Sequence, residues 1–469
     1  MPMSDTQRER ELKFAVPDDF VVPDLSPLLP AGGSVERGVV TLESTYYDTA
    51  ARDLLGAGLT LRRRTGDDDT GWQLKVPDGD SRIEVRVPLG GRGVPAELRE
   101  LTAGARGRSA LKPIATLRTE RHVHRLLDDA GDSLAEVVDD SVVSHTQREF
   151  AITRSWREVE VELHDGSEKL LKKASTLLHD HGAEDATIGS KLRHALDVAD
   201  APAPDPDMLS GTIARYLDEQ FEALVRGDVQ LRRGEDVVHP TRVATRRYRS
   251  VLRIFGRAFD PARAEHLDVE LKWFAAALGE VRDAQVLRRH LDDALDDLPA
   301  DLVIGPVRTR IDRALDAEED AARQALATLM AGPRYLALVR DLRSWREDLP
   351  LLEDGPAREV KKYLRRAERK LDKRLSAARG ADRGDETHHR ARKAAKRTRY
   401  VAELARPVLG SKARKSAKRA KKLQQRFGDR QDNVLAARFL LRLGAETGRN
   451  GFTFGLLYQR ERAHGDAIA

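Results

Sequence analysis

The chain has 469 residues, of which 40% are hydrophobic and 34% charged, with 82 Lys and Arg against 77 Asp and Glu. This length favours two or three domains, and the apolar content is sufficient for buried cores. The absence of cysteine excludes disulfides, thiolate metal sites and thiol catalysis. With neither a bilayer-spanning apolar run nor a signal-peptide core, the sequence predicts a soluble, cytoplasmic protein without a membrane partner.

Strand-like segments dominate the chain before residue 199. Apolar and polar residues alternate in ERELKFAV, GLTLRRR, GWQLKV, SRIEVRVPL and WREVEVEL, and turn-forming sequences separate them. Helical periodicity is confined to residues 166–181 and 191–199. The pattern predicts an antiparallel sheet or barrel with flanking helices.

Charged side chains recur on one face of several of these strands. Residues two apart share a strand face, which groups Glu9, Glu11 and Lys13, and likewise Glu160 with Glu162. One interpretation is an ordinary solvated face, and the other is a barrel whose interior is a charged tunnel. The recurrence of both signs over five or six strands favours the tunnel.

Such a tunnel would suit a polyanion bound through a divalent metal. Carboxylates at Glu9, Glu11, Glu160 and Glu162 offer the hard oxygen ligands that suit Mg²⁺ or Mn²⁺. Arginine and lysine suit phosphate oxygens, and the basic positions are Lys13, Arg62, Arg64, Lys75 and Arg86. A chain of phosphates is therefore the natural ligand.

The order of these motifs resembles the CYTH domains, the triphosphate tunnel metalloenzymes. The resemblance is carried by Glu9-Arg-Glu11-Leu-Lys13, Tyr46-Tyr-Asp48-Thr, Leu61-Arg62-Arg-Arg64, Trp72-Gln-Leu-Lys75, Glu84-Val-Arg86, Glu160-Val-Glu162 and Ser190-Lys191. It implies an eight-stranded antiparallel tunnel over residues 5–198 that acts on triphosphate compounds with Mg²⁺ or Mn²⁺.

The same resemblance assigns roles to individual residues. It implies metal ligation by Glu9, Glu11, Asp140, Glu160 and Glu162, and catalytic roles for Glu9, Glu11 and Lys13. It implies phosphate contacts from Lys13, Arg62, Arg64, Lys75, Arg86, Arg121 and Lys191. Arg118 and Asp139 are alternatives to Arg121 and Asp140, because the two members of each choice lie on opposite strand faces.

A proline-rich segment, ADAPAPDPD at residues 199–207, separates this half from the second one. Its three prolines are incompatible with a helix or a central strand and predict a semi-rigid linker. From residue 208 onwards, long Ala/Leu/Arg-rich stretches have helical periodicity, with Pro and Gly between them. The chain is thus predicted to be an α+β protein of two domains, the second an all-α bundle over residues 208–469.

An internal repeat predicts that this bundle is duplicated, over about residues 208–345 and 356–469. The segment His239-Pro-Thr-Arg242-Val-Ala-Thr-Arg246-Arg247-Tyr-Arg249 aligns with His389-Arg-Ala-Arg392-Lys393-Ala-Ala-Lys396-Arg397-Thr-Arg399. At about 100° per residue, the shared positions fall in one stripe on each helix. Residues 388–426 hold fifteen Lys and Arg but one acid, Glu403, so a positive groove between the stripes is favoured over a solvated face of mixed charge.

These motifs resemble the CHAD domain, the conserved histidine α-helical domain. The resemblance implies binding of inorganic polyphosphate by His239, Arg242, Arg246, Arg249, His389, Arg392, Lys393, Lys396 and Arg399. The whole chain is therefore expected to be a metal-dependent inorganic triphosphatase, or a phosphohydrolase of polyphosphate, with a polyphosphate-binding helical domain. The alternative is a polyphosphate-binding scaffold of polyphosphate granules with marginal catalysis. Nucleic acid is disfavoured as a partner, because the basic stripes lack interleaved aromatic residues.

Overall fold

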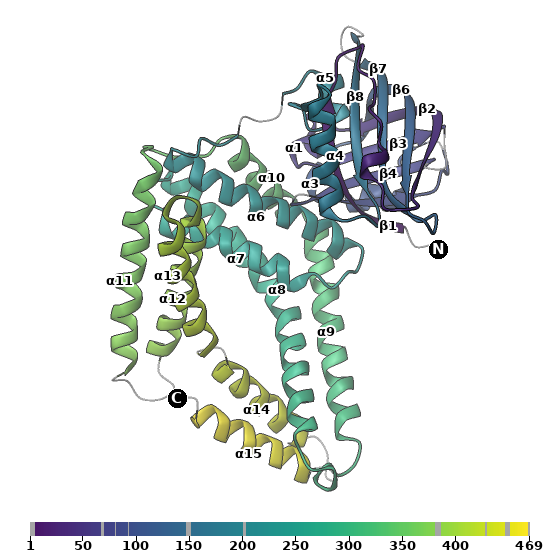
Figure 1. Cartoon of the computed structure of the whole chain (residues 1–469). Helices are drawn as coiled ribbons and strands as arrows, with labels where there is room; N and C mark the ends of the chain where they lie inside the picture. Colours follow the sequence, from purple (N-terminus) through teal and green to yellow (C-terminus); the bar gives the residue numbers. More distant parts are fainter. Residues whose placement is uncertain are drawn as a thin grey trace. The chain divides into compact units, whose positions relative to one another are not determined.

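The computed structural model describes residues 5–66, 70–79, 81–91, 93–146, 152–199, 203–379, 386–426, 429–445 and 451–467. Within these ranges, the side chains of residues 5–9, 379, 386, 389, 426, 429–432 and 465–467 lie outside the description. The chain divides into two compact units, Met1–Pro202 and Ala203–Ala469 (Figure 1). The first unit, here called the β unit, is built on an antiparallel sheet, and the second, the helical unit, consists of α-helices. The two-domain prediction is confirmed.

Nine antiparallel strands form the sheet within the described residues, in the order β5-β4-β3-β2-β6-β7-β8-β1-β9. A further pairing joins β1 to β5 and matches residues 5–9 with residues 82–86. The expected number was eight, and the ninth strand is a two-residue addition that pairs with Phe14 and Ala15. The strands are β1 (Asp5–Ala15), β2 (Ser34–Asp48), β3 (Thr60–Thr65), β4 (Gly71–Asp78), β5 (Ser81–Val87), β6 (Lys112–Leu127), β7 (Ser133–Thr146), β8 (Ile152–Leu163) and β9 (Glu184–Asp185).

Both predicted helical segments of the β unit are present, as α4 (Glu168–Asp180) and α5 (Lys191–Leu196). Helix α4 packs Leu170, Ala174 and Leu178 into an apolar core with side chains of β1, β7 and β8. Shorter helices are η1 (Ser26–Leu28), α1 (Asp53–Gly56), α2 (Ala96–Leu101) and α3 (Ala103–Arg106). Since residues alternate along a strand, the apolar side chains that β8 gives to this core leave its glutamates on the opposite face.

Ten α-helices make up the described part of the helical unit. They are α6 (Leu209–Arg232), α7 (Val238–Ile254), α8 (Pro261–Asp296), α9 (Val307–Ala331), α10 (Pro333–Glu347), α11 (Val360–Arg379), α12 (Glu386–Leu404), α13 (Arg406–Arg426), α14 (Asp429–Ala445) and α15 (Gly451–Ala467), with the short turns η2 (Ala300–Leu302) and η3 (Ala357–Glu359). Pro261 and Pro333 begin helices, as expected for a residue that cannot donate a backbone hydrogen bond. Helices α14 and α15 pack against α8 and α9 (Figure 1) through a core that includes Leu291, Leu440 and Phe454. The described helices include none with the length and apolarity needed to cross a membrane.

The second part of the predicted linker belongs to the helical unit. The backbone N–H of Ala357 donates to Asp207 and that of Leu209 donates to Gly355, both at 2.7 Å. Met208 and Pro356 form an isolated β-bridge. Residues 207–209 are therefore fixed to the turn before α11 by backbone hydrogen bonds, so the end of the predicted semi-rigid linker is part of the helical unit.

Candidate functional site

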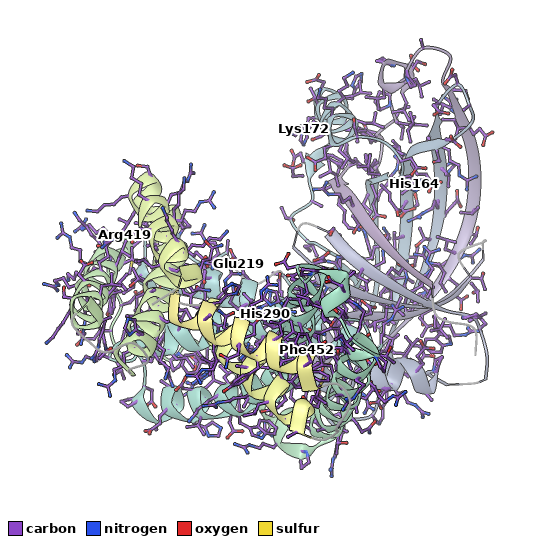
Figure 2. All side chains as sticks on the ribbon, turned by 90° about the horizontal axis from the view of Figure 1, so that it is seen from below. His164, Lys172, Glu219, His290, Arg419 and Phe452 are labelled. Atoms are coloured by element: carbon purple, nitrogen blue, oxygen red, sulfur yellow. The ribbon has the colours of Figure 1, made fainter. Side chains whose placement is uncertain are left out.

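The charged face of the sheet lines a cavity of about 360 Å³. His164, labelled in Figure 2, is one of the lining residues, whereas Lys172 marks α4. Among the described residues, nine basic and four acidic side chains line the cavity: Lys13, Arg62, Arg64, Lys75, Arg82, Arg86, Arg121, Arg125, Lys191, Glu11, Glu136, Glu160 and Glu162. The excess of basic side chains makes this cavity suited to an anion with several charges.

Strand register brings the acidic side chains together. Glu11 of β1 lies opposite Glu162 of β8, and Lys13 lies opposite Glu160. On the other side of β8, Glu162 lies opposite Glu136 of β7. A row of three carboxylates therefore crosses three neighbouring strands, and a lysine–glutamate pair lies beside it.

One group of carboxylates surrounds the ammonium of Lys191, at the first position of α5. Lys191 Nζ lies 2.9 Å from Asp140, 2.6 Å from Glu158 and 2.8 Å from Glu160. The side chain of Ser190 caps this helix by accepting from the backbone N–H of Arg193 at 3.2 Å. Burial opposes the charge of Lys191, but the three carboxylates outweigh it and raise its pKa.

Arg121 completes this buried network. Its guanidinium donates two hydrogen bonds to Asp140, at 2.8 and 2.7 Å, and a longer one of 3.4 Å to Glu160. Burial would raise the pKa of Glu160, but Lys13, Lys191 and Arg121 lower it well below its ordinary value. Oxygen atoms of Asp140, Glu158 and Glu160 lie within 4.8 Å of one another, a spacing that could hold a metal ion. In this arrangement, the Lys191 ammonium contacts all three, and Arg121 and Lys13 supply further positive charge to Asp140 and Glu160.

The row containing Glu11 and Glu162 is a second group of carboxylates that could contribute metal ligands. These two directly opposed carboxylates repel each other. Burial raises the pKa of Glu162, and the nearby Glu11 and Glu160 add to the effect. For Glu11, burial is outweighed by Lys13 and more distant cations, which lower its pKa. Because carboxylate oxygens are the ligands that Mg²⁺ and Mn²⁺ prefer, Glu11 and Glu162 could serve as donors, and Glu160 could join them by exchanging its contacts with Lys13, Arg121 and Lys191.

The predicted phosphate contacts of β3 are held in place by neighbouring polar groups. Arg62 donates to Gln73 at 2.5 Å and to the Tyr46 hydroxyl at 3.4 Å. Arg64 donates to Ser44 at 3.2 Å. Both guanidiniums are less than 10% exposed, so their side chains are ordered before any ligand binds.

Two further predicted contacts share one fully buried carboxylate. Lys75 lies 3.4 Å and Arg86 2.6 Å from Glu84, whose side chain is 0% exposed. Glu84 thus orients one cation from β4 and one from β5 at the edge of the cavity.

Arg121 and Asp140 lie on the inner side of the sheet, whereas the alternative residues Arg118 and Asp139 lie on its outer side. Arg118 is exposed, and Asp139 accepts hydrogen bonds from Arg157 at 2.9 and 2.6 Å. Glu9 lies in β1, two residues before Glu11, but its side chain is outside the described residues.

Four charged residues near the cavity were missing from the predicted site. Arg82 and Glu158 lie on the same strand faces as Arg86 and Glu160, so alternation alone could have included them. Arg125 and Glu136 form an ion pair of 2.9 Å between β6 and β7, which depends on a register that the sequence does not show.

The Tyr46–Asp48 motif serves the fold as well as the cavity. Tyr46 lines the cavity, whereas Asp48 is almost fully buried and accepts from the backbone N–H groups of Thr49, Leu54 and Leu55. Asp48 therefore satisfies free donors at the start of α1.

In the helical unit, the first basic stripe forms part of a cluster of cations. His239, Arg242 and Arg246 lie on α7. Burial lowers the pKa of Arg242, and of the nearby charges only Asp283 opposes the effects of Arg246, Arg282 and Arg392. Because Arg392 belongs to α12, this influence indicates that the two predicted stripes approach each other. Burial also lowers the pKa of His239, as do Arg282 and other neighbouring arginines.

Other members of the predicted polyphosphate site have different surroundings. Arg249 pairs with Asp268 at 3.0 Å, and Arg399 with Glu403 at 2.7 Å. Lys393 is exposed, and Lys396 lies half-buried on the same helix. His389 is also on α12, but its side chain is outside the described residues.

Comparisons with known proteins identify both units. Residues 7–187 match the CYTH domain model and residues 215–441 the CHAD domain model. An uncharacterized protein of Mycobacterium tuberculosis strain H37Rv is 34% identical over 490 residues, which cover 97% of this chain and 92% of the relative. Its counterpart in strain CDC 1551 matches equally well.

Solved structures resemble each unit. A CHAD domain from the plant Ricinus communis is 28% identical, covers 57% of this chain and 93% of its own, and has a TM-score of 0.46. A Hippeastrum protein named as an adenylyl cyclase, with a dominant triphosphatase activity, is 18% identical, covers 42% of this chain and 98% of its own, and has a TM-score of 0.24. The assignment rests on the two domain models and the mycobacterial relative: the chain belongs to the family of proteins in which a CYTH domain precedes a CHAD domain.

Proposed function

We propose that the β unit is a phosphohydrolase that cleaves inorganic tripolyphosphate or polyphosphate with Mg²⁺ or Mn²⁺, and that the helical unit binds polyphosphate. CYTH domains include metal-dependent triphosphatases and cyclases. The observation that carries the proposal is the cavity, in which nine cations meet four carboxylates. Phosphoryl transfer depends chiefly on such positioning and charge stabilisation.

The lining favours an inorganic substrate over a nucleotide. Apart from its charged and small polar residues, the cavity presents only Val40, Tyr46, Val123, His164 and Gly189 among the described residues. Tyr46 is itself buried and bonded to Arg62. A nucleobase would need an apolar or aromatic surface of its own, whereas a phosphate chain needs the charges alone.

Different residues of the cavity would bind the phosphate chain and the metal ion. Arg62, Arg64, Lys75, Arg86 and Arg121 would hold the phosphate oxygens, and Lys13 would bridge the phosphate and carboxylate sides. Glu11, Glu160 and Glu162 would hold the divalent ion, with Glu9 beside them on β1. Bound metal supplies charge neutralisation at the phosphoanhydride.

Phosphate release from tripolyphosphate, long-chain polyphosphate, ATP and thiamine triphosphate tests this proposal directly. The intact chain should release phosphate fastest from an inorganic substrate, and only with Mg²⁺ or Mn²⁺. Glu11→Gln should lower the rate by about 100-fold or more. Glu120→Gln, at an exposed position of β6, is the matched control and should retain activity. Equal rates for the intact chain and Glu11→Gln would contradict the proposal.

The scaffold alternative is favoured by one observation, the contact of the Lys191 ammonium with Asp140, Glu158 and Glu160, which commits these carboxylates to an internal cation. A scaffold would bind polyphosphate equally well with and without Glu11→Gln and release no phosphate. Its binding would be lost when Arg242, Arg246, Arg392 and Lys396 are changed to Gln. The activity screen separates the two functions.

A further inference from the structure

A second cationic pocket lies in the helical unit, between the end of α7 and helices α11 and α12. Its volume is about 200 Å³. Five basic side chains line it: Arg253, Arg257, Arg366, Lys370 and Arg397. We call it the α7–α11 pocket.

The positive charge of the pocket arises from a difference in sequence between the two aligned basic segments. Arg247 and Arg397 occupy equivalent positions, each eight residues after its histidine, and Arg253 and Glu403 are equivalent, fourteen residues after theirs. Where α7 meets α12, Arg247 pairs with Glu403 at 3.1 Å. The reciprocal pair is Arg397 with Arg253, so the carboxylate is replaced by a second guanidinium, and both of these arginines line the α7–α11 pocket.

Among the described residues, neither Arg397 nor Lys370 has an ion-pair partner. Burial lowers the pKa of Arg397, and Arg253 and Arg249 act in the same direction. Burial also lowers the pKa of Lys370, together with Arg397, Arg374 and Arg366. The nearest acid on α8, Asp268, is already shared by Arg249 and Arg253 at 3.0 and 2.8 Å. The pocket therefore holds positive charge that the described chain does not neutralise.

Its size and walls restrict the ligand. A cavity of about 200 Å³ is smaller than the roughly 300–1,000 Å³ of drug-sized ligand sites. One wall is Tyr363, which packs against Phe255 with ring centroids 4.3 Å apart, and Ala367 and Ala394 fill the space between the cations. Guanidiniums from α7, α11 and α12 and an ammonium from α11 can meet the oxygens of one compact tetrahedral anion.

From this arrangement we propose that the α7–α11 pocket binds a phosphate group, in the position where the other helix crossing has Glu403. Free diphosphate and the end of a polyphosphate chain share this chemistry. The site is separate from the cluster around His239 and does not depend on hydrolysis in the β unit. Binding would join the end of α7 to α11 and α12, as Glu403 joins Arg247 to Arg399.

Hydrogen exchange resolved by peptide tests the site locally on the intact chain, with chelator present to exclude metal-dependent binding. Diphosphate should slow exchange in residues 250–257, 360–371 and 391–398. Long-chain polyphosphate should protect these peptides and also residues 239–249. If polyphosphate protects these peptides and diphosphate does not, the pocket does not bind free diphosphate. If citrate protects them as strongly as diphosphate does, the pocket is not specific for phosphate.

Two substitutions at one position make the test specific. Arg397→Glu places a carboxylate beside Arg253. Without any added anion, this variant should show slower hydrogen exchange in residues 250–257. Diphosphate should then cause no further slowing. Arg397→Gln should weaken diphosphate binding by about 30-fold or more while keeping the fold. Arg247→Gln, at the crossing that contains Glu403, is the matched control and should keep the response. An Arg397→Gln chain that responds like the unchanged protein would overturn the proposal.

Discussion

The ammonium nitrogen of Lys191 lies 2.6 Å from a carboxylate oxygen of Glu158, and this ion pair joins the first turn of α5 to the middle of β8. Asp140 and Glu160 lie within 2.9 Å of the same nitrogen atom. A single side chain thus contacts three carboxylates that the fold removes from water. The cost of losing it should exceed that of losing any one of its partners.

Lys191→Met should destabilise the β unit by about 3–5 kcal/mol, because it removes the cation that contacts all three buried carboxylates and leaves their negative charge under-compensated. The deficit should shrink as the pH falls and those carboxylates become protonated. Urea unfolding of the β unit at several pH values measures both effects. Lys172→Met, on the exposed face of α4, should change stability by less than about 0.5 kcal/mol. A deficit independent of pH would contradict the electrostatic explanation.

Glu162→Gln should stabilise the metal-free β unit but reduce the stabilisation that Mg²⁺ gives it. It removes the repulsion of Glu11 and a buried charge, so the metal-free β unit should unfold at a higher temperature. At a Mg²⁺ concentration of about 100 times Kd, the unchanged chain should gain about 2.7 kcal/mol, and the variant should gain much less. Thermal unfolding with and without Mg²⁺ tests this independently of catalysis. Glu120→Gln should leave the metal response intact, and an unchanged response in Glu162→Gln would exclude Glu162 from the metal site.

Asp218, on α6, should make the helical unit less stable as the pH rises. Burial raises its pKa from 3.8 to about 6, although Arg346 lies 3.5 Å away. Between these two values the folded state binds more protons than the unfolded state, so stability falls with increasing pH and stays low above about 6. Asp218→Asn should therefore stabilise the unit by about 1–3 kcal/mol at pH 8 and by little at pH 3.5. The exposed Asp301→Asn is the control, and a gain of equal size at both pH values would refute the titration of Asp218.

Gly279 gives Arg242 the space that its present position needs. A Cβ atom at residue 279 would lie 3.3 Å from Nη2 of Arg242 and 3.7 Å from its Nε. Gly279→Ala should displace this flexible guanidinium and weaken polyphosphate binding several-fold, with a change in stability below about 1 kcal/mol. Gly455→Ala, with open space around it on α15, should leave binding unchanged. Calorimetric titration with polyphosphate measures the difference.

The alternation of residues in the β unit was enough to predict much of its inner face. Lys13, Arg62 and Glu160 line the cavity as expected, because period-2 spacing assigns each side chain to a face before the fold is known. The same rule cannot choose between Arg118 and Arg121, since it does not say which face is enclosed. In the structure, Ala115 and Leu117, which share a strand face with Arg121, are buried in a core, whereas Arg118 on the opposite face is exposed, and this decides the choice.

Contacts between distant elements were beyond the sequence. The pair of Arg125 and Glu136 depends on the register that the turn between β6 and β7 sets. In the helical unit, spacing put Arg249 in the basic stripe, but its acidic neighbour Asp268 comes from α8 and could not be assigned from helical periodicity. Arg399 pairs with Glu403 four residues later on the same helix, a neighbour that periodicity does predict. A stripe of basic residues therefore overestimates the number of cations available to a ligand.

The ion pairs inside the cavity make ligand binding an exchange of partners. A phosphate that reaches Arg121 or Lys13 must compete with Asp140 or Glu160, which already occupy these cations. A singly charged ion gains little from this competition, whereas a chain of phosphates can replace several internal pairs at once. The enclosed carboxylates thereby compete with any anion that enters the cavity. Singly charged anions such as chloride are rejected, and the preference for a ligand over chloride increases with each additional charge on the ligand.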